Sequence, residues 1–217
     1  MKRISLAFFC IPVFVGAILL LPGVLNAGVH ETVTQSVTVT SATSTATIHW
    51  AVPEMRVGAP GTNDDTMFFL TVRNSGSVLF TTPVIASSTP AGTYDTPILL
   101  DVPNGTYDIG FKGHQHLTKI LRTVPLNGSN RVLNFSRLDY TNLLKGTEVL
   151  EAGDINGTTT SAALMGDDKV NALDLTTLLS QFNATDKFAR PNLNQDAKVN
   201  ALDLTIILKN FNHLGQT

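Results

Sequence analysis

The sequence predicts two domains: an all-β antiparallel sandwich over residues 28–145, followed by an all-α module over residues 146–217. In the first region, short runs of β-branched and apolar residues recur between Gly, Pro and Asn turn signals, which is typical of a small sandwich. In the second region, apolar residues are spaced by three and four positions, which indicates amphipathic helices. The period changes near residues 142–150, so we place the domain boundary there.

The N-terminal segment, residues 1–27, predicts export. Lys2 and Arg3 precede the uncharged run Ile4–Leu21, and Ala27 offers a small residue before a cleavage point. A basic start, an apolar middle and a small residue at the cut are typical of a secretory signal peptide. We therefore expect a secreted, extracellular protein, attached to a membrane only if this segment stays uncleaved. The single cysteine, Cys10, lies inside the segment, so neither an internal disulfide nor a cysteine zinc site is expected.

Composition and motifs narrow the function classes. The chain has 15 basic and 17 acidic residues, a net charge of −2, which argues against nucleic-acid binding through bulk positive charge. It contains no nucleophile elbow, phosphate-binding loop or dinucleotide fingerprint, so we expect no enzyme. Glycoside hydrolysis by a pair of carboxylates remains an alternative. His114 and His116 have no third ligand in view, and we expect them to be surface histidines on one strand face.

Seven runs predict the strands of the sandwich. Turn signals such as Asn74-Ser75-Gly76 separate them and supply the positive or fixed φ that tight turns need. Residues 28–42, rich in Thr and Ser, either extend the first strand or form a disordered or glycosylated leader. The stretch Val102–Ile109 (VPNGTYDI) resembles an edge of transthyretin-like and carboxypeptidase-regulatory-like domains, so an Ig-like or transthyretin-like sandwich is expected. The predicted strands are Ala46–Val52, Met67–Arg73, Ser77–Val84, Pro97–Val102, Thr106–Lys112, Leu117–Val124 and Arg131–Phe135.

A duplication occupies the C-terminal region. Lys169–Asn183 aligns with Lys198–Asn212 without a gap, and 11 of the 15 aligned positions are identical. Each copy predicts a helix with one apolar face. These faces are Leu175, Leu178, Leu179 and Phe182 in the first copy, and Leu204, Ile207, Leu208 and Phe211 in the second.

Oxygen-bearing residues precede the second helix with the spacing of a calcium loop. Side chains at alternate positions can turn onto one cation, position 7 offers its carbonyl, and position 12 closes the shell from the new helix. The alternative is a polar turn that only caps the helix. The candidate ligands at positions 1, 3, 5, 7, 9 and 12, called loop two below, are Asn192, Asn194, Asp196, Lys198, Asn200 and Asp203.

The first copy, called loop one, has the same spacing but is interrupted. Nine extra residues, Thr158–Gly166, are expected to be looped out, which costs little closure entropy. Alternatively, Thr158 stands at position 5 and the site is broken. Because loop one offers three carboxylates against two in loop two, the sequence predicts tighter calcium binding at loop one. Its candidate ligands, in the same order, are Asp154, Asn156, Asp167, Lys169, Asn171 and Asp174.

Residues 151–214 resemble a type I dockerin domain, a pair of EF-hand-type loop–helix repeats. The resemblance rests on Gly153-Asp154-Ile155-Asn156 and on the sequence VNALDL, which occurs at 170–175 and again at 199–204. It implies two Ca²⁺ ions and docking onto a cohesin-type protein domain, as in cellulosome-like or cell-surface assemblies. Two departures are Asn192 at position 1 of loop two, usually Asp, and Ala197 at position 6, where Gly would ease a positive φ.

The resemblance also implies that the residues at positions 10 and 11 contact the partner. These are Ala172 and Leu173 in the first copy and Ala201 and Leu202 in the second, an identical pair that would allow two binding orientations. Alternatively, Leu173 and Leu202 pack between the helices. Two other functions stay open: polysaccharide degradation, with the sandwich binding or hydrolysing glycan, and a surface structural role in which calcium serves only stability.

Overall fold

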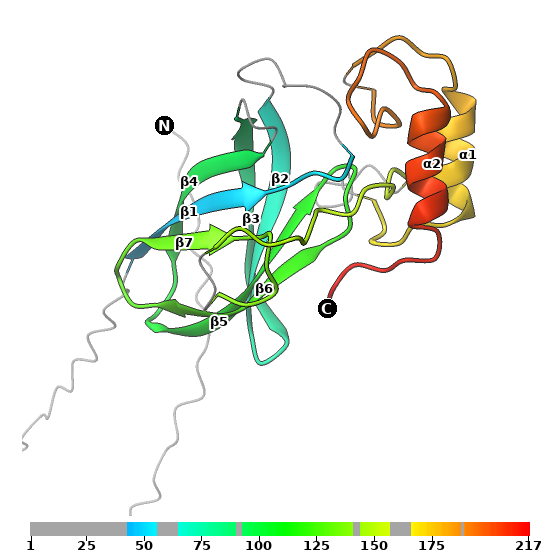
Figure 1. Cartoon of the computed structure of the whole chain (residues 1–217). Helices are drawn as coiled ribbons and strands as arrows, with labels where there is room; N and C mark the ends of the chain where they lie inside the picture. The colour runs from blue at the N-terminus through cyan, green and yellow to red at the C-terminus, as the bar shows by residue number, and fades with distance from the viewer. Residues whose placement is uncertain (1–42, 56–64, 90–92, 141–143, 157–165, 188) are drawn as a thin grey trace, which may run out of the picture. The chain divides into compact units, whose positions relative to one another are not determined.

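The computed structural model describes residues 43–55, 65–89, 93–140, 144–156, 166–187 and 189–217 (Figure 1). The predicted signal peptide and the Thr-rich leader lie outside the described residues. A compact unit, residues 39–217, contains all of the described chain. No helix in the described ranges is both long enough and apolar enough to cross a membrane.

All seven predicted strands are present, and they form a β-sandwich. Neighbouring strands are hydrogen-bonded in the order β6-β5-β2-β3-β4-β1-β7. The β3–β4 link contains only Ser87↔Asp95 and Ser88↔Tyr94, and there the sheet folds into two layers that share one core. The strands are β1 Thr43–Ala51, β2 Asp65–Asn74, β3 Ser77–Ser88, β4 Tyr94–Asp101, β5 Gly105–Gly113, β6 Lys119–Leu126 and β7 Arg131–Asn134.

The expectation of a purely antiparallel sandwich is wrong at one pairing. Strand β7 runs parallel to β1, with Ala46 opposite Arg131 and His49 opposite Asn134. Strands β6 and β7 stand at opposite ends of the strand order, so their connection crosses between the layers and brings β7 to β1 in the parallel direction. Turn signals mark where a strand ends, but they do not encode the strand with which the chain next pairs.

Aromatic side chains fill the shared core. Phe68 and Phe111 stack with ring centroids 4.3 Å apart, and Phe111 and Phe135 with centroids 4.9 Å apart. Each fully buried side chain of this size contributes about 1.5–3 kcal/mol through the apolar area removed from water. At the turn before β5, the Tyr107 hydroxyl donates to the Pro103 carbonyl at 2.8 Å and fixes the predicted Pro-Asn-Gly turn.

Two nine-residue helices follow, α1 Ala172–Ser180 and α2 Ala201–Lys209. Each begins with a capping box. The side chain of Asn171 or Asn200 accepts backbone N–H groups of the first turn, and the side chain of the aspartate three residues later accepts the backbone N–H of that asparagine. Each is followed by an asparagine in the left-handed region, Asn183 with φ 73° and Asn212 with φ 67°. The rest of the described part of residues 146–217 consists of turns, bends and isolated bridges, so an all-α module is not what the structure shows.

A second hydrophobic core lies beneath the helices. Only part of each predicted apolar face enters it: Leu178 and Ile207 are fully buried, whereas Leu179, Phe182, Leu208 and Phe211 are exposed. Leu117, which precedes β6, completes this core from outside the predicted module. Its buried members are Leu117, Ala152, Ile155, Val170, Leu178, Leu193, Val199, Ile206 and Ile207.

Candidate metal centre

Loop two folds around the carboxylate of Asp203, which is fully buried. Its Oδ1 accepts the backbone N–H groups of Leu193 at 2.7 Å and Asn194 at 3.2 Å, and its Oδ2 accepts that of Asn200 at 2.8 Å. Burial raises the pKa of Asp203, and these three hydrogen bonds oppose the rise. The predicted position 12 therefore ties the start of the loop to the helix that follows it.

The other predicted ligands of loop two gather around Asp196. The side-chain amides of Asn194 and Asn200 each donate to Asp196 Oδ2 at 3.2 Å, and the backbone N–H of Lys198 donates to Oδ1 at 2.7 Å. Asn192 is buried, and its Nδ2 donates to the carbonyls of Asp186 and Asp196. Its Oδ1 is buried and accepts no hydrogen bond from any described residue.

These residues fit a hard divalent cation. A buried oxygen without a donor is costly unless an ion or a water satisfies it, and Asn192 Oδ1 is such an oxygen at position 1. The set offers only carboxylate, amide and carbonyl oxygens, which Ca²⁺ prefers. The described residues contain no group of three or more His, Cys, Asp or Glu side chains poised for a metal. Four of the six candidate donors of loop two are neutral, namely three asparagine amides and the Lys198 carbonyl.

Loop one repeats the same hydrogen-bond frame. Asp174 Oδ1 accepts from the backbone N–H groups of Ile155 and Asn156 at 2.7 and 2.8 Å, and its Oδ2 accepts that of Asn171 at 2.8 Å. Asp167 takes the place of Asp196, since its oxygens accept from Lys169 N at 3.2 Å and from Asn171 Nδ2 at 3.5 Å.

The frame bears on the predicted insertion in loop one. Asp154 and Asn156 occupy the places of positions 1 and 3, as both alternatives require, and Asp167 takes the place of position 5. The alternative ligand, Thr158, lies outside the described residues. Asn156 Oδ1 is buried and has no hydrogen-bond partner within the described ranges.

Position 1 of loop one differs from its counterpart. Asp154 is fully buried and accepts the backbone N–H groups of Asp167 and Asp168 at 3.0 and 2.8 Å. The ammonium of Lys112, from β5, donates to its Oδ2 at 2.5 Å. Gly166 passes so close that a Cβ there would lie 1.9 Å from Asp154 Oδ1. Burial raises the pKa of Asp154 to about 6, and the charge of Lys112 opposes the rise.

The left-handed residue of loop two is not at position 6, where the sequence places it, whereas loop one has one at position 6 and a second before position 5. In loop two it is Gln195, with φ 52°, rather than Ala197 at position 6. In loop one Gly166 has φ 84° and Asp168, at position 6, has φ 64°. The residue just before position 5 therefore adopts a positive φ in both loops, and Ala197 carries no such strain.

The β5–β6 connection contacts both loops, which sequence reasoning missed. Gln115 Nε2 donates to the carbonyls of Arg190 at 2.8 Å and Asn192 at 3.1 Å. Arg190 in turn donates to the carbonyls of His114 at 2.9 Å and Asn156 at 3.1 Å. His116 lies in this connection and is buried, so the expectation of two surface histidines on a strand is wrong. The one signal was a polar HQH run between apolar strands.

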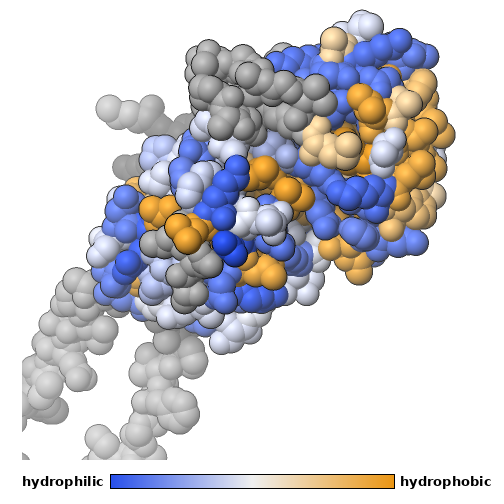
Figure 2. All heavy atoms as spheres, viewed as in Figure 1, coloured by the Kyte–Doolittle hydropathy of each residue, from blue (hydrophilic) through white to orange (hydrophobic). Residues whose placement is uncertain are grey.

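The predicted recognition pairs are exposed. Leu173 is 62 % exposed and Leu202 49 %, and Ala172 and Ala201 are exposed beside them, so the alternative that both leucines pack between the helices is wrong. Figure 2 shows apolar side chains gathered over α1 and α2. We call these residues the helix surface: Ala172, Leu173, Leu179, Phe182, Ala201, Leu202, Leu208 and Phe211.

No protein-family model matches the chain, and no curated protein matches it. Among solved structures, the chain is similar to two crystal structures of a type II cohesin–X-dockerin complex from Acetivibrio cellulolyticus, a C-terminal and an N-terminal interface mutant. The identities are 19 % and 18 %, the TM-scores 0.48 and 0.47, and each match covers 80 % of this chain and 97 % of the other. At these TM-scores the likeness assigns neither a fold nor a function to this chain.

Proposed function

We propose that the chain is a secreted, non-catalytic protein whose C-terminal loop–helix pair binds Ca²⁺ and docks through the helix surface onto a cohesin-type domain. The observation that carries the proposal is the repeated frame. Asp174 and Asp203 hold equivalent backbone groups in loop one and loop two, so both loops present their oxygens in the same order.

The chemistry of loop two supports the calcium part of the proposal. Asn192 Oδ1 is a buried acceptor without a described donor, and Asp196 and Asp203 supply two carboxylates within the same short loop. A bound Ca²⁺ would supply the positive charge that these oxygens lack. The residues of this chain that would hold it are those predicted from the spacing. Lys198 would act through its backbone carbonyl, because an ammonium group cannot ligate a cation, and its side chain is exposed.

The helix surface supports the docking part. Two short helices expose identical Ala-Leu pairs at their first turns and a leucine further along, and an exposed phenylalanine follows each helix. Exposed apolar patches of this kind mark interaction sites in soluble proteins. Because the capped helix starts are equivalent, either repeat can present the same contact, and we expect a partner to bind in two orientations.

The docking test uses the chain beginning at Gly28 and a panel of type I and type II cohesin domains immobilised on a sensor surface. We expect binding in calcium that is lost in EDTA. Leu173→Asp and Leu202→Asp alone should weaken it only severalfold, whereas the double variant should abolish it, because a buried unpaired carboxylate is costly in either orientation.

The matched control is Leu99→Asp, on β4 of the sandwich. Leu99 is 65 % exposed, so its replacement adds the same charge at a comparable surface site away from the helices. It should bind as the unmodified chain does. Failure of every cohesin domain to bind, or equal losses for Leu99→Asp and the double variant, would contradict the docking proposal.

A further inference from the structure

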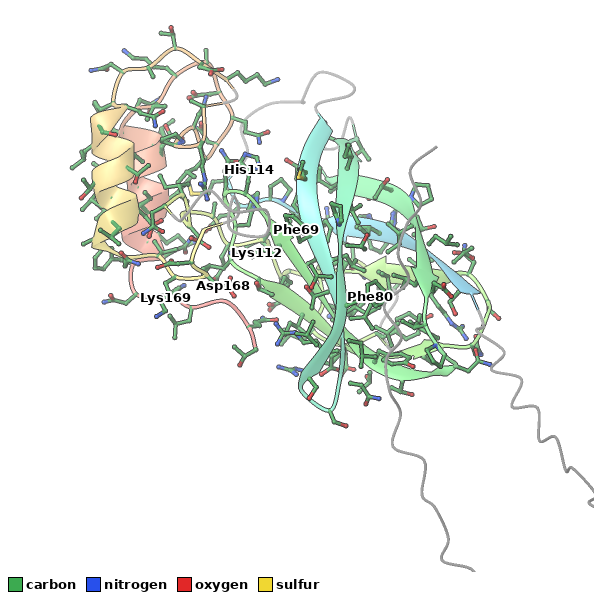
Figure 3. All side chains as sticks on the ribbon, turned by 180° about the vertical axis from the view of Figure 1, so that it is seen from behind. Phe69, Phe80, Lys112, His114, Asp168 and Lys169 are labelled. Atoms are coloured by element: carbon green, nitrogen blue, oxygen red, sulfur yellow. The ribbon has the colours of Figure 1, made fainter. Side chains whose placement is uncertain are left out.

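Lys112 is bound at loop one through all three hydrogens of its ammonium group. It donates to Asp154 Oδ2 at 2.5 Å, to Asp168 Oδ1 at 2.9 Å and to the His116 carbonyl at 3.1 Å. Figure 3 shows Lys112 beside Asp168. The side chain of Lys112 is only 15 % exposed, and that of Asp154 is completely buried. Position 1 of loop one therefore already has a cation, supplied by β5.

The remaining contacts of Asp154 close the site further. Its Oδ1 accepts the backbone N–H of Asp167, and its Oδ2 accepts that of Asp168 in addition to Lys112. Gly166 lies against the carboxylate and leaves no room for a side chain. An ion that ligates Asp154 must therefore displace the ammonium or lie beside it, and both cost free energy in a buried site.

Loop two has no such cation. Position 1 is the neutral Asn192, whose Oδ1 has no described donor. In the described residues, no lysine or arginine side chain forms an ion pair with Asp196 or Asp203. The two loops thus share a frame but differ in whether the protein itself supplies the positive charge.

We propose that Lys112 is a built-in competitor of calcium at loop one, so that loop two is the tight calcium site and loop one binds weakly until the ammonium is displaced. This inference rests on the proposed calcium binding. It reverses the order predicted from the number of carboxylates, because Lys112, far from Asp154 in sequence, neutralises the charge that favoured loop one.

The first experiment assigns the tight site by calorimetric titration of the chain beginning at Gly28 with CaCl₂. Asp167→Ala and Asp196→Ala remove the equivalent ligand, position 5, from loop one and loop two. We expect Asp196→Ala to remove the tight binding and Asp167→Ala to leave its affinity within about twofold. The opposite order would overturn the inference.

The second experiment removes the competitor. Lys112→Met should tighten calcium binding at loop one at least tenfold, and Asp167→Ala should then abolish that gain. The control is Lys119→Met, which removes another buried lysine whose partner, Glu148, belongs to neither loop. It should leave both affinities unchanged. An unchanged loop-one affinity in folded Lys112→Met would overturn the inference.

A third variant covers the case in which Lys112→Met alone fails to fold. Lys112→Met combined with Asp154→Asn gives loop one the neutral position 1 of loop two and leaves no buried unpaired charge, although it gives up one of the two backbone N–H bonds that the carboxylate accepts. It should also bind calcium at loop one more tightly than the unmodified chain. Calcium binding without this gain would overturn only the role of Lys112, whereas no calcium binding in any protein would overturn the proposed function as well.

Discussion

Loop one and loop two have the same backbone frame and differ at their first position. In both, an aspartate at the third residue of the helix accepts three backbone N–H groups. At position 1, however, Asp154 is satisfied by two backbone donors and Lys112, whereas Asn192 has an oxygen without a described donor. The comparison shows that ligand spacing determines the frame, whereas contacts from outside the repeat make the two first positions differ, since β5 supplies an ammonium group to Asp154.

The outside contacts come from the sandwich. In the β5–β6 connection, Gln115 donates to two carbonyls at the start of loop two, and Leu117 packs in the second core. Glu54, which follows β1, is buried and accepts from Ala152 N, Lys209 and Asn210. The C-terminal region is therefore bonded to the sandwich at several points. The proposed boundary near residues 142–150 stays a prediction.

The largest expected effect is on stability without calcium. Lys112→Met removes the cation of a buried pair and leaves Asp154 uncompensated, which costs about 3–5 kcal/mol at pH 7. Lys119→Met should cost much less, because its partner Glu148 is 42 % exposed and stays hydrated. Urea unfolding of both variants in EDTA measures the difference. Equal losses would mean that Asp154 does not depend on Lys112.

A smaller effect should fall on loop two. Gln115 is buried, and Gln115→Ala leaves the carbonyls of Arg190 and Asn192 without their donor, at a cost of about 1–3 kcal/mol. Calcium affinity should fall at loop two and stay unchanged at loop one, as measured by titration in the Asp167→Ala and Asp196→Ala backgrounds. Equal losses at both loops would show that the connection acts on the module as a whole.

A pH effect tests the contact between His114 and Arg190, which lies between the two loops. Burial, and secondarily the charge of Arg190, lowers the pKa of His114 from 6.5 to about 4. The unfolded chain therefore binds the proton more readily, and stability present above pH 6.5 is lost as the pH falls toward 4. The loss should be about 1–2 kcal/mol between pH 7 and pH 5.

The variant His114→Gln isolates the contribution of His114 to this pH dependence. The raised pKa of Asp154 acts in the opposite direction between about pH 4 and 6, because its folded state holds the proton more tightly. The unfolding free energies of the unmodified chain and of His114→Gln, compared at both pH values in EDTA, cancel the common contribution of Asp154. A difference that does not change with pH would contradict the assignment to His114.

Much of the architecture could be predicted from the sequence, because strands and helices depend on patterns of neighbouring residues. Turn residues separate the seven strands, and the i, i+3, i+4 spacing marks both helices. The equivalent places of Asp167 and Asp196 follow from the repeat. The parallel β1–β7 pairing could not be predicted, because it depends on where a connection crosses the sandwich. Nor could Lys112, since only the folded chain brings it to Asp154.

The smallest expected effect is the relief of backbone strain at Gln195 of loop two. The residue before position 5 has a positive φ in both, but it is Gly166 in loop one and Gln195 in loop two. A non-glycine residue in the left-handed region costs about 1–2 kcal/mol, and the greater entropy of an unfolded glycine offsets part of any gain from its removal. Gln195→Gly should therefore stabilise the chain by no more than about 1 kcal/mol.

Thermal unfolding in EDTA can resolve this change. A gain of about 1 kcal/mol corresponds to a rise in Tm of about 2–4 °C in a chain of this size. The counterpart, Gly166→Ala, should lower the Tm, because its Cβ would meet Asp154 Oδ1 as well as the unfavourable φ. Gln195 also has a weak 3.5 Å bond to Gln115, so Gln195→Ala serves as the control for losing that side chain. If Gln195→Gly is no more stable than Gln195→Ala, the left-handed backbone of loop two carries no strain. The geometry of the loop must then be held by the hydrogen bonds of its candidate ligand residues alone.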